Sequence, residues 1–174
     1  GYTNLVAIDK HPHNTRMLAE LHPDITVIEA DLAESGPWQQ QFDGTEVVIM
    51  LQAQIGALTE EPFIRNNIHS TRHVIDACHK YSVPYIVHIS SSVVESVAND
   101  FYTNSKKAQE QLVEECGIPH IILRPTLMFG WFDRKHLGWL SRFMQKSPVF
   151  PIPSHGRFMR QPLYVKDFCN IIIS

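Results

Sequence analysis

The sequence predicts an α/β fold built on a doubly wound parallel sheet with helices on both faces. Three observations predict it. Short apolar segments rich in β-branched residues recur along the chain, as expected of buried strands. Longer segments with apolar residues three and four positions apart separate them, as expected of amphipathic helices. Their regular alternation predicts βαβ units and therefore parallel strands.

The predicted strands are short and largely apolar. The first reads NLVAID, and the fourth begins at Pro84, which the start of a strand tolerates. The fifth stops at Arg124 and Pro125, because proline cannot continue a hydrogen-bonded ladder. The predicted strands are residues 4–9, 25–30, 46–51, 84–89 and 119–123, with a short extended segment at 163–165.

The predicted helices lie between these strands. Residues 63–81 form the longest, and Gly117 ends the helix that begins at Tyr102. The predicted helices are residues 13–21, 63–81, 102–116, 136–145 and a last one from Asp167 onward, and the proline-rich stretch 148–153 is expected to be a loop. The result is a Rossmann-like sheet, in which ligands bind at the carboxyl ends of the strands.

Composition restricts the kinds of partner. A net charge of -3 argues against a nucleic-acid binder, and no apolar run reaches the roughly 18 residues of a membrane helix. Cys78, Cys116 and Cys169 are far apart in sequence and are expected to be small buried residues rather than disulfide partners. We therefore expect a cytoplasmic protein without a metal site, and leave a homodimer open.

One expected motif is missing. A dinucleotide-binding sheet normally opens with a strand and a G-x-G-x-x-G turn that carries the pyrophosphate, and neither is in this sequence. We therefore expect an internal stretch of a longer protein, with a gap in its sheet where the missing strand would be central. We predict a dinucleotide-binding domain over residues 1–130 and part of a substrate-binding region over residues 131–174.

The clearest chemical motif runs from Ser90 to Lys106. Ser90, Ser91 and Ser92 follow the predicted strand 84–89, and Tyr102 and Lys106 lie one turn apart on the next helix. A free tyrosine has a pKa of about 10, but a lysine ammonium and a nicotinamide cation nearby favour the phenolate. Such a pair could move a proton while a nicotinamide moves a hydride, with a serine hydroxyl on the substrate oxygen. A tyrosine and a lysine at this spacing also occur by chance; the preceding serine triplet favours the functional interpretation.

Three strand ends carry candidate cofactor contacts. Asp9 could accept hydrogen bonds from the adenosine ribose and repel a 2′-phosphate, which favours NAD over NADP, although Lys10 beside it weakens that argument. Alternatively, Asp9 caps the helix that begins near His13. Asp31, followed by Leu32, could accept from the adenine amino group or be an N-cap, and neither alternative is preferred.

The third strand end is Leu51, Gln52 and Ala53, and it is expected to run beneath the pyrophosphate and ribose. Small or neutral side chains there would allow the close approach that such a cofactor needs. The alternative is a loop with no contact to a ligand.

Taken in order, these segments resemble the extended short-chain dehydrogenases, specifically the NAD-dependent epimerase/dehydratase group that acts on nucleotide sugars. The resemblance spans essentially the whole chain, and it depends on the order and spacing of several motifs. The matching segments are Val6–Asp9, Glu29–Leu32, Asn67 with Thr71, Ile89–Ser92, Tyr102–Lys106, Leu123–Thr126, Phe129–Gly130, and Arg160 with Tyr164–Asp167.

The resemblance implies roles for individual residues. Ser92, Tyr102 and Lys106 would form the catalytic trio, and Ser92 would also contact the substrate. Arg160 would bind a nucleotide-sugar diphosphate, because a guanidinium suits bidentate phosphate binding. Alternatively, Arg160 is an ordinary surface arginine. The residues implied to contact NAD are Asp9, Asp31, Leu32, Leu51, Gln52, Ala53, Asn67, Ser90, Tyr102, Lys106, Pro125 and Thr126.

The departures from the family pattern affect the substrate side. The segment between Ser92 and Tyr102 is short, Val94–Ser96 replaces a usual Tyr-Gly, Trp131 replaces a proline, and Ser70 replaces a glycine. The stretch Arg160–Val165 also resembles atypical members, such as the NAD(P)-binding accessory subunit of respiratory complex I and NmrA-like sensors. Two functions therefore stay open: an NAD-dependent epimerase, dehydratase or oxidoreductase, and a dinucleotide-binding sensor without turnover.

Overall fold

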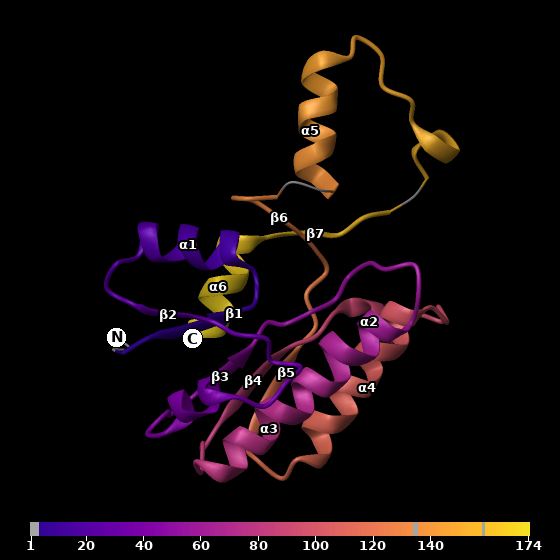
Figure 1. Cartoon of the computed structure of the whole chain (residues 1–174). Coiled ribbons are helices and arrows are strands. Elements are labelled where there is room, and N and C mark those ends of the chain that lie inside the picture. Colours follow the sequence, from indigo (N-terminus) through magenta and orange to yellow (C-terminus); the bar gives the residue numbers. More distant parts are fainter. Residues whose placement is uncertain (1–3, 134–135, 158) are drawn as a thin grey trace. The chain divides into compact units, whose positions relative to one another are not determined.

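The computed structural model describes residues 4–133, 136–157 and 159–174, and places them in two compact units. The first unit comprises residues 1–123 and the second residues 124–174. Figure 1 follows the chain through both, and each unit is described by itself. The division falls seven residues before the domain boundary predicted at residue 130, and the functional assignment of the two domains stays a prediction.

The strands of the first unit form two parallel ladders, as the alternation of strands and helices predicts. β1 (Val6–Asp9) pairs with β2 (Thr26–Glu29). β4 (Ile86–Ile89) lies between β3 (Val48–Met50) and β5 (His120–Leu123). No hydrogen bonds join β1–β2 to β3–β4–β5 in the described part of the chain, so the break falls where the sequence predicts a gap.

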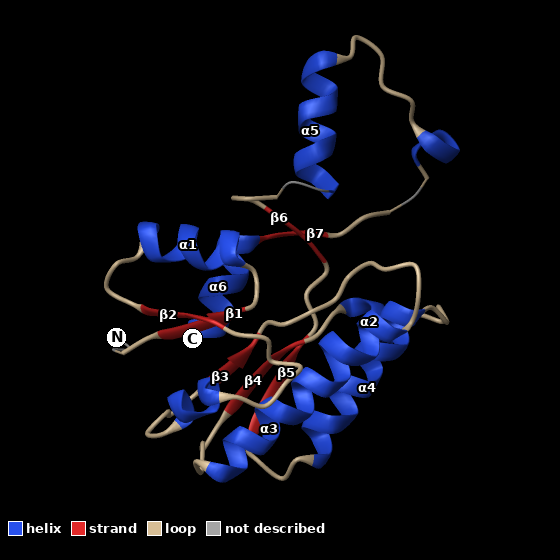
Figure 2. Ribbon diagram, viewed as in Figure 1, coloured by secondary structure: helices blue, strands red, loops and turns tan. Residues whose placement is uncertain are grey.

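Helices cover these ladders (Figure 2). α1 (Pro12–Leu21) packs on β1 and β2, while α3 (Ser70–Lys80) and α4 (Phe101–Glu115) lie side by side and α4 contacts β5. Three shorter elements complete the unit: α2 (Glu61–Phe63), the π-helix η2 (Ile64–His69) and the 3₁₀ helix η3 (Ser92–Glu95). The helices that follow β1, β3 and β4 therefore begin near the carboxyl ends of these strands, where ligands bind in such folds.

The long helix predicted over residues 63–81 is interrupted. It consists of α2, the π-helical turn η2 and α3, rather than one regular α-helix. In η2, the Asn67 side chain is fully buried, and the hydroxyl of Ser70 donates to the Asn66 carbonyl oxygen. Apolar spacing predicts which face of the segment is buried, but it carries no information on a local change of helical pitch. Such π-turns are frequent at functional sites.

The connection between β2 and β3 contains a 3₁₀ helix that the sequence pattern did not predict. This helix, η1 (Pro37–Phe42), buries the Trp38 and Phe42 rings, whose centroids lie 5.7 Å apart. The Trp38 indole also donates to the Glu34 carbonyl oxygen at 2.9 Å. Six residues are too few for apolar periodicity to reveal a helix, so only the packing exposes it.

The core of the first unit joins β3, β4, α3, α4 and η1. Its fully buried members come from all five elements and from the turns that connect them, and β4 is buried at every residue. The core residues are Trp38, Phe42, Met50, Val74, Ile75, Ala77, Cys78, Val83, Ile86, Val113 and Ile118.

The second unit contains a strand that was not predicted. β6 (Leu127–Phe129) pairs in parallel with β7 (Pro162–Tyr164), which confirms the extended segment expected near 163–165. At Gly130 the φ angle is 140°, and an added Cβ would lie 2.6 Å from Val165 Cγ1, so a side chain here would force the turn apart. The strand was not predicted because it has three residues and begins two positions after Pro125, which interrupts the apolar pattern.

The rest of the second unit is α5 (His136–Lys146), the 3₁₀ helix η4 (Pro153–Gly156) and α6 (Val165–Ile173). α5 and α6 confirm two predicted helices, and η4 begins at Pro153, the last residue of the predicted loop. Cys78 is buried as predicted, but Cys169 on α6 is exposed, so the expectation of three buried cysteines was wrong. Among the described residues, no helix has both the length and the apolar character needed to cross a membrane.

Candidate active site

Helix α4 begins just before the Tyr102–Lys106 pair because Asp100 caps it. The Asp100 carboxylate accepts from the Thr103 backbone N–H at 2.8 Å and from the Thr103 hydroxyl at 3.0 Å. The hydrogen bond from the Thr103 backbone is the main reason why the pKa of Asp100 lies below its ordinary value. The cap fixes the first turn of the helix, and thereby the place of Tyr102, which is half-buried.

Lys106 lies one turn further along and its side chain is buried at the carboxyl end of β4. Its ammonium group donates to the Ile89 carbonyl oxygen at 3.0 Å and to Gln109 Oε1 at 2.8 Å. Burial lowers the pKa of Lys106 to about 8, against the opposing charge of Glu110. At neutral pH the group is therefore still mostly charged, and two of its three N–H donors have partners in the described residues.

The serine triplet continues from β4 as the sequence predicts. The Ser90 backbone N–H donates to the Leu123 carbonyl oxygen at 2.8 Å, which extends the β4–β5 ladder by one residue. Ser91 caps η3 by accepting from the Val93 backbone N–H, and Ser92 is the first residue of η3. Since η3 contacts α4, Ser92, Tyr102 and Lys106 lie on elements that meet, although no hydrogen bond joins their side chains within the described residues.

Two buried polar groups at these strand ends have no partner. Neither Ser90 Oγ nor Gln52 Nε2 makes a hydrogen bond to any described residue. Both belong to residues predicted to contact a dinucleotide. A buried donor without a partner is costly, and a ligand bearing hydroxyl and phosphate oxygens would satisfy both. The residues present therefore fit such a cofactor, while Leu51 and Ala53 beside Gln52 are exposed.

Asn67, also predicted to line the cofactor, has a different set of contacts. Its side-chain oxygen accepts from the Gln54 backbone N–H at 2.6 Å, and its Nδ2 donates to the Gln54 carbonyl at 3.2 Å and to Ser105 Oγ at 2.8 Å. The Ser105 hydroxyl in turn donates to the Tyr102 carbonyl at 2.8 Å. Asn67 thus ties the loop after β3 to the first turns of α4.

The Asp9 carboxylate lies at the end of β1 and makes local contacts. It accepts from the His11 backbone N–H at 2.8 Å and from Asn14 Nδ2 at 3.0 Å. Asp9 is not the N-cap of α1, because that position is His11 and no side chain caps it; the bonds of Asp9 instead brace the turn that leads into the helix. Lys10 is directed elsewhere, because its ammonium donates to Asn66 Oδ1 at 2.6 Å and lies 3.9 Å from Asp31.

Asp31 is the centre of an ion-pair network. It accepts from the Ala33 backbone N–H at 2.9 Å and pairs with the Arg65 guanidinium at 2.7 Å, and Arg65 also reaches Glu34 at 2.6 Å. Burial alone would raise the pKa of Asp31, but these hydrogen bonds and the nearby cations outweigh it, and the pKa lies below its usual value. Sequence reasoning missed Arg65, because its two partners lie 34 and 31 residues earlier.

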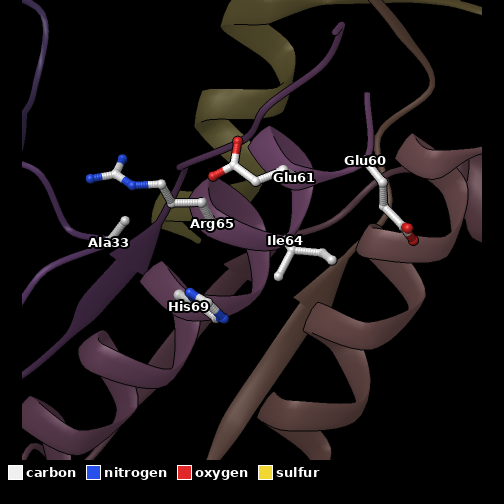
Figure 3. Close-up of a pocket in the computed structure, with 6 residues that line it drawn as sticks. All are labelled: Ala33, Glu60, Glu61, Ile64, Arg65 and His69. Carbon is white, nitrogen blue, oxygen red and sulfur yellow. The ribbon is translucent and has the colours of Figure 1, made fainter. Parts of the chain in front are cut away.

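A hollow of about 340 Å³ opens beside this network (Figure 3). None of its lining residues is a predicted site residue, although Ala33 follows the predicted Asp31–Leu32 pair. The lining residues are Ala33, Glu60, Glu61, Ile64, Arg65 and His69.

Of the remaining predicted residues, Leu32 is half-buried against the core of the first unit, and the others belong to the second unit. Pro125 is buried, Thr126 is half-buried and Arg160 is exposed. Their roles at the nicotinamide end and on a diphosphate stay predictions.

Three buried polar residues around Lys106 were not anticipated: His88 on β4, and Gln109 and Glu110 on α4. Neither ring nitrogen of His88 has a partner among the described residues, and burial lowers its pKa to about 3. A signal was available for the two helical residues, since positions three and four after Lys106 share its face of the helix.

Parallel strands, helices between them and polar groups gathered at the strand ends define a Rossmann-like α/β protein of the dinucleotide-binding type. The sequence model of the NAD-dependent epimerase/dehydratase family matches residues 1–174. The chain belongs to that family, as its motifs predict.

Two curated relatives are similar in sequence. Ceramide reductase of Caulobacter vibrioides is 29% identical over 131 residues, covering 75% of this chain and 41% of that protein. The decarboxylating sterol-4-alpha-carboxylate 3-dehydrogenase erg26 of Schizosaccharomyces pombe is 27% identical over 143 residues, covering 70% of this chain and 42% of that protein. The chain thus spans about two fifths of the length of these relatives.

Solved structures share the fold at low identity. The dTDP-glucose 4,6-dehydratase DesIV of Streptomyces venezuelae, solved with NAD, gives a TM-score of 0.82 at 14% identity, covering 99% of this chain and 62% of that one. UDP-glucuronic acid 4-epimerase of Bacillus cereus, solved with UDP-glucuronic acid and NAD, gives 0.79 at 20% identity, covering 98% and 64%.

Proposed function

We propose that the protein containing this chain is an NAD-dependent enzyme that oxidises an alcohol carbon or reduces the corresponding carbonyl, with Tyr102 as its acid/base. One observation carries the proposal: Tyr102 and Lys106 lie one turn apart on the capped start of α4, with the Lys106 ammonium held at the carboxyl end of β4. Strand ends of this kind of sheet are where its ligands bind.

The chain's own residues have separate tasks in this proposal. Tyr102 takes the proton from the substrate hydroxyl, and Ser92 holds the substrate oxygen through its own hydroxyl. The buried Lys106 ammonium favours the tyrosine phenolate by its charge. NAD, when bound, accepts or returns the hydride.

The residues fit NAD in two ways. Ser90 and Gln52 each offer a buried polar group that lacks a partner. Asp9 places a carboxylate at the end of β1, where it favours a ribose hydroxyl and disfavours a 2′-phosphate. The solved relatives that contain NAD support the same choice of cofactor.

Two substrate classes are supported by different observations. A nucleotide sugar agrees with the family resemblance, with Arg160 as a diphosphate ligand, and with the substrates named for the solved relatives. A lipid alcohol or ketone agrees with the two curated relatives, which are named for ceramide and for a sterol carboxylate. The short segment between Ser92 and Tyr102 departs from the sugar-epimerase pattern and argues against the first class.

A Tyr102→Phe variant of the full-length protein tests the proposal. Turnover with NAD should fall by about a thousandfold or more, because the general acid/base is lost, while NADH binding measured by fluorescence stays within about twofold. Tyr85→Phe is the matched control, since Tyr85 lies just before the amino end of β4 and should leave turnover unchanged.

A dinucleotide sensor without turnover is the competing function. It predicts that the parent protein binds NADH but converts neither a nucleotide-sugar panel nor a sterol and ceramide panel. That result, or equal turnover in the parent and in Tyr102→Phe, would remove the catalytic proposal. A cytoplasmic location and a homodimer are separate predictions, which cell fractionation and light scattering would check.

A further inference from the structure

The buried end of Lys106 belongs to a chain of hydrogen bonds that crosses from α4 to α3. The Lys106 ammonium donates to Gln109 Oε1 at 2.8 Å, and Gln109 Nε2 donates to Thr71 Oγ1 at 2.9 Å. All three side chains are buried. Lys106 and Gln109 share one face of α4, whereas Thr71 lies on α3, 38 residues before Gln109.

The chemistry of these groups fixes the orientation of the Gln109 amide. An ammonium group only donates hydrogen bonds, so the atom of Gln109 that faces Lys106 must be the oxygen. The amide nitrogen then faces Thr71, whose hydroxyl oxygen accepts. A reversed amide would set donor against donor at Lys106 and leave buried groups without hydrogen-bond partners, which is unfavourable. Thr71 therefore holds the acceptor in place.

We propose that Gln109 is a positioning residue for Lys106, which holds the ammonium group at the carboxyl end of β4 with an uncharged acceptor. A carboxylate in its place would lock the lysine in its charged form. Gln109 does not touch the reacting atoms, and acts only through Lys106.

The charged and titratable groups near Lys106 come from three elements. Helix α4 contributes Glu110 and, one turn before Lys106, Tyr102. Strand β4 contributes His88, and the charge of His120 on β5 helps to lower the pKa of His88. Thr71, from α3, is uncharged. Glu110 favours the ammonium form, but burial outweighs it and keeps the pKa of Lys106 at about 8. Because Gln109 is neutral, it leaves the pKa of Lys106 low, whereas a second carboxylate beside the amine would raise that pKa.

The inference rests on the proposed function in one respect: the charge of Lys106 must support Tyr102. Activity should then decline as Lys106 loses its proton, so the alkaline limb of kcat/KM should follow the titration of this lysine. The titration itself can be observed without turnover, which separates the two ideas.

The experiment compares Gln109→Glu and Gln109→Met in the full-length protein. The titration of Lys106 is followed by the ¹³Cε NMR signal of labelled lysine, assigned by its loss in Lys106→Met. Gln109→Glu should raise the pKa of Lys106 by about one unit or more, and Gln109→Met should lower it. The alkaline limb of kcat/KM should move in the same directions.

Two further variants control the experiment. Gln111→Glu adds the same charge to the same helix, but the Gln111 side chain is exposed and donates to Glu115, so the Lys106 titration should not move. Thr71→Val removes the acceptor that orients Gln109 and should lower the pKa of Lys106, which provides a test if the charged variant does not fold.

Unchanged titration of Lys106 in the Gln109 variants and in Thr71→Val would overturn the positioning role. So would an equal shift in Gln111→Glu. If the titration moves as expected while the parent shows no turnover on any substrate, the positioning role stands and the proposed function fails.

Discussion

At the scale of single residues, the carboxylates at the strand ends have local partners that decide what each can do for a ligand. Asp31 is engaged by Arg65 and by the Ala33 backbone N–H, so an adenine amino group would have to share it. Within the described residues, the Asp9 side chain accepts from His11 and Asn14 alone, and Lys10 is drawn away toward Asn66. Asp9 is therefore the better candidate for selecting the cofactor.

Replacing Asp9 by Asn tests this selection. The parent should bind NADH more tightly than NADPH, and Asp9→Asn should reduce that preference by about tenfold, equivalent to roughly 1.4 kcal/mol, because the repulsion of the 2′-phosphate is lost. Fluorescence titration of both cofactors measures the ratio. Asp24→Asn, an exposed change before β2, is the control, and tighter NADPH binding by the parent would contradict the assignment.

His88 makes stability depend on pH. Its folded pKa, about 3, lies below the unfolded value of about 6.5, because burial disfavours the imidazolium. Between these values the unfolded state binds more protons than the folded state, so stability falls as pH decreases from about 6.5 toward 3, by on the order of 1 kcal/mol per pH unit.

His88→Leu should therefore flatten the acid-induced loss of stability, and should cost little at pH 7 because no hydrogen bond is lost. Urea midpoints at several pH values between 7 and 4 measure the slope. His79→Gln, an exposed change on α3, should keep the parental slope. The same slope in His88→Leu would show that another group carries the acid sensitivity.

At the scale of elements, the short helices η1 and η2 are the least predictable from sequence, although they pack the core and position residues near the site. The π-turn η2 carries Asn67 into contact with Gln54 and Ser105, and η1 fills the core with two rings. Both are short, so neither leaves a regular period in the sequence. The long helix α4 (Phe101–Glu115), in contrast, lies within one residue at each end of the helix predicted over residues 102–116.

Trp38→Ala tests the contribution of η1. The unfolding free energy should fall by about 3–5 kcal/mol, because the indole is buried against Phe42 and leaves a large cavity. Urea denaturation measures the loss, and Gln40→Ala, an exposed change in the same helix, provides the control. A loss below about 1 kcal/mol would mean that η1 is not part of the cooperative core.

At the scale of the molecule, the β3–β4–β5 ladder carries the buried centre of the first unit. β4 is hydrogen-bonded to a strand on each side and is buried throughout. In the second unit, β6 and β7 form a ladder of two strands. The β3–β4–β5 ladder should therefore be locally more stable than the β6–β7 ladder.

Hydrogen exchange measured by mass spectrometry checks this difference. Backbone amides of residues 86–90 should belong to the slowest class in the full-length protein, slower than those of residues 127–129. Equal exchange in the two segments would show that the β3–β4–β5 ladder is not the most stable part of the molecule.

The sequence by itself determined the parallel α/β architecture, the family and the placing of Tyr102 and Lys106 on one helix, because periodicity and short spacings are local properties of the chain. Only the tertiary structure decided that Lys106 reaches the end of β4, that Gln109 bonds Thr71 of α3, that Asn67 clamps Gln54 to α4, and that Asp31 pairs with Arg65. These contacts join residues from separate elements, up to 38 positions apart, and depend on how α3 and the π-turn pack against α4. Hydrophobic patterning determines which face is buried, but not which polar groups meet there.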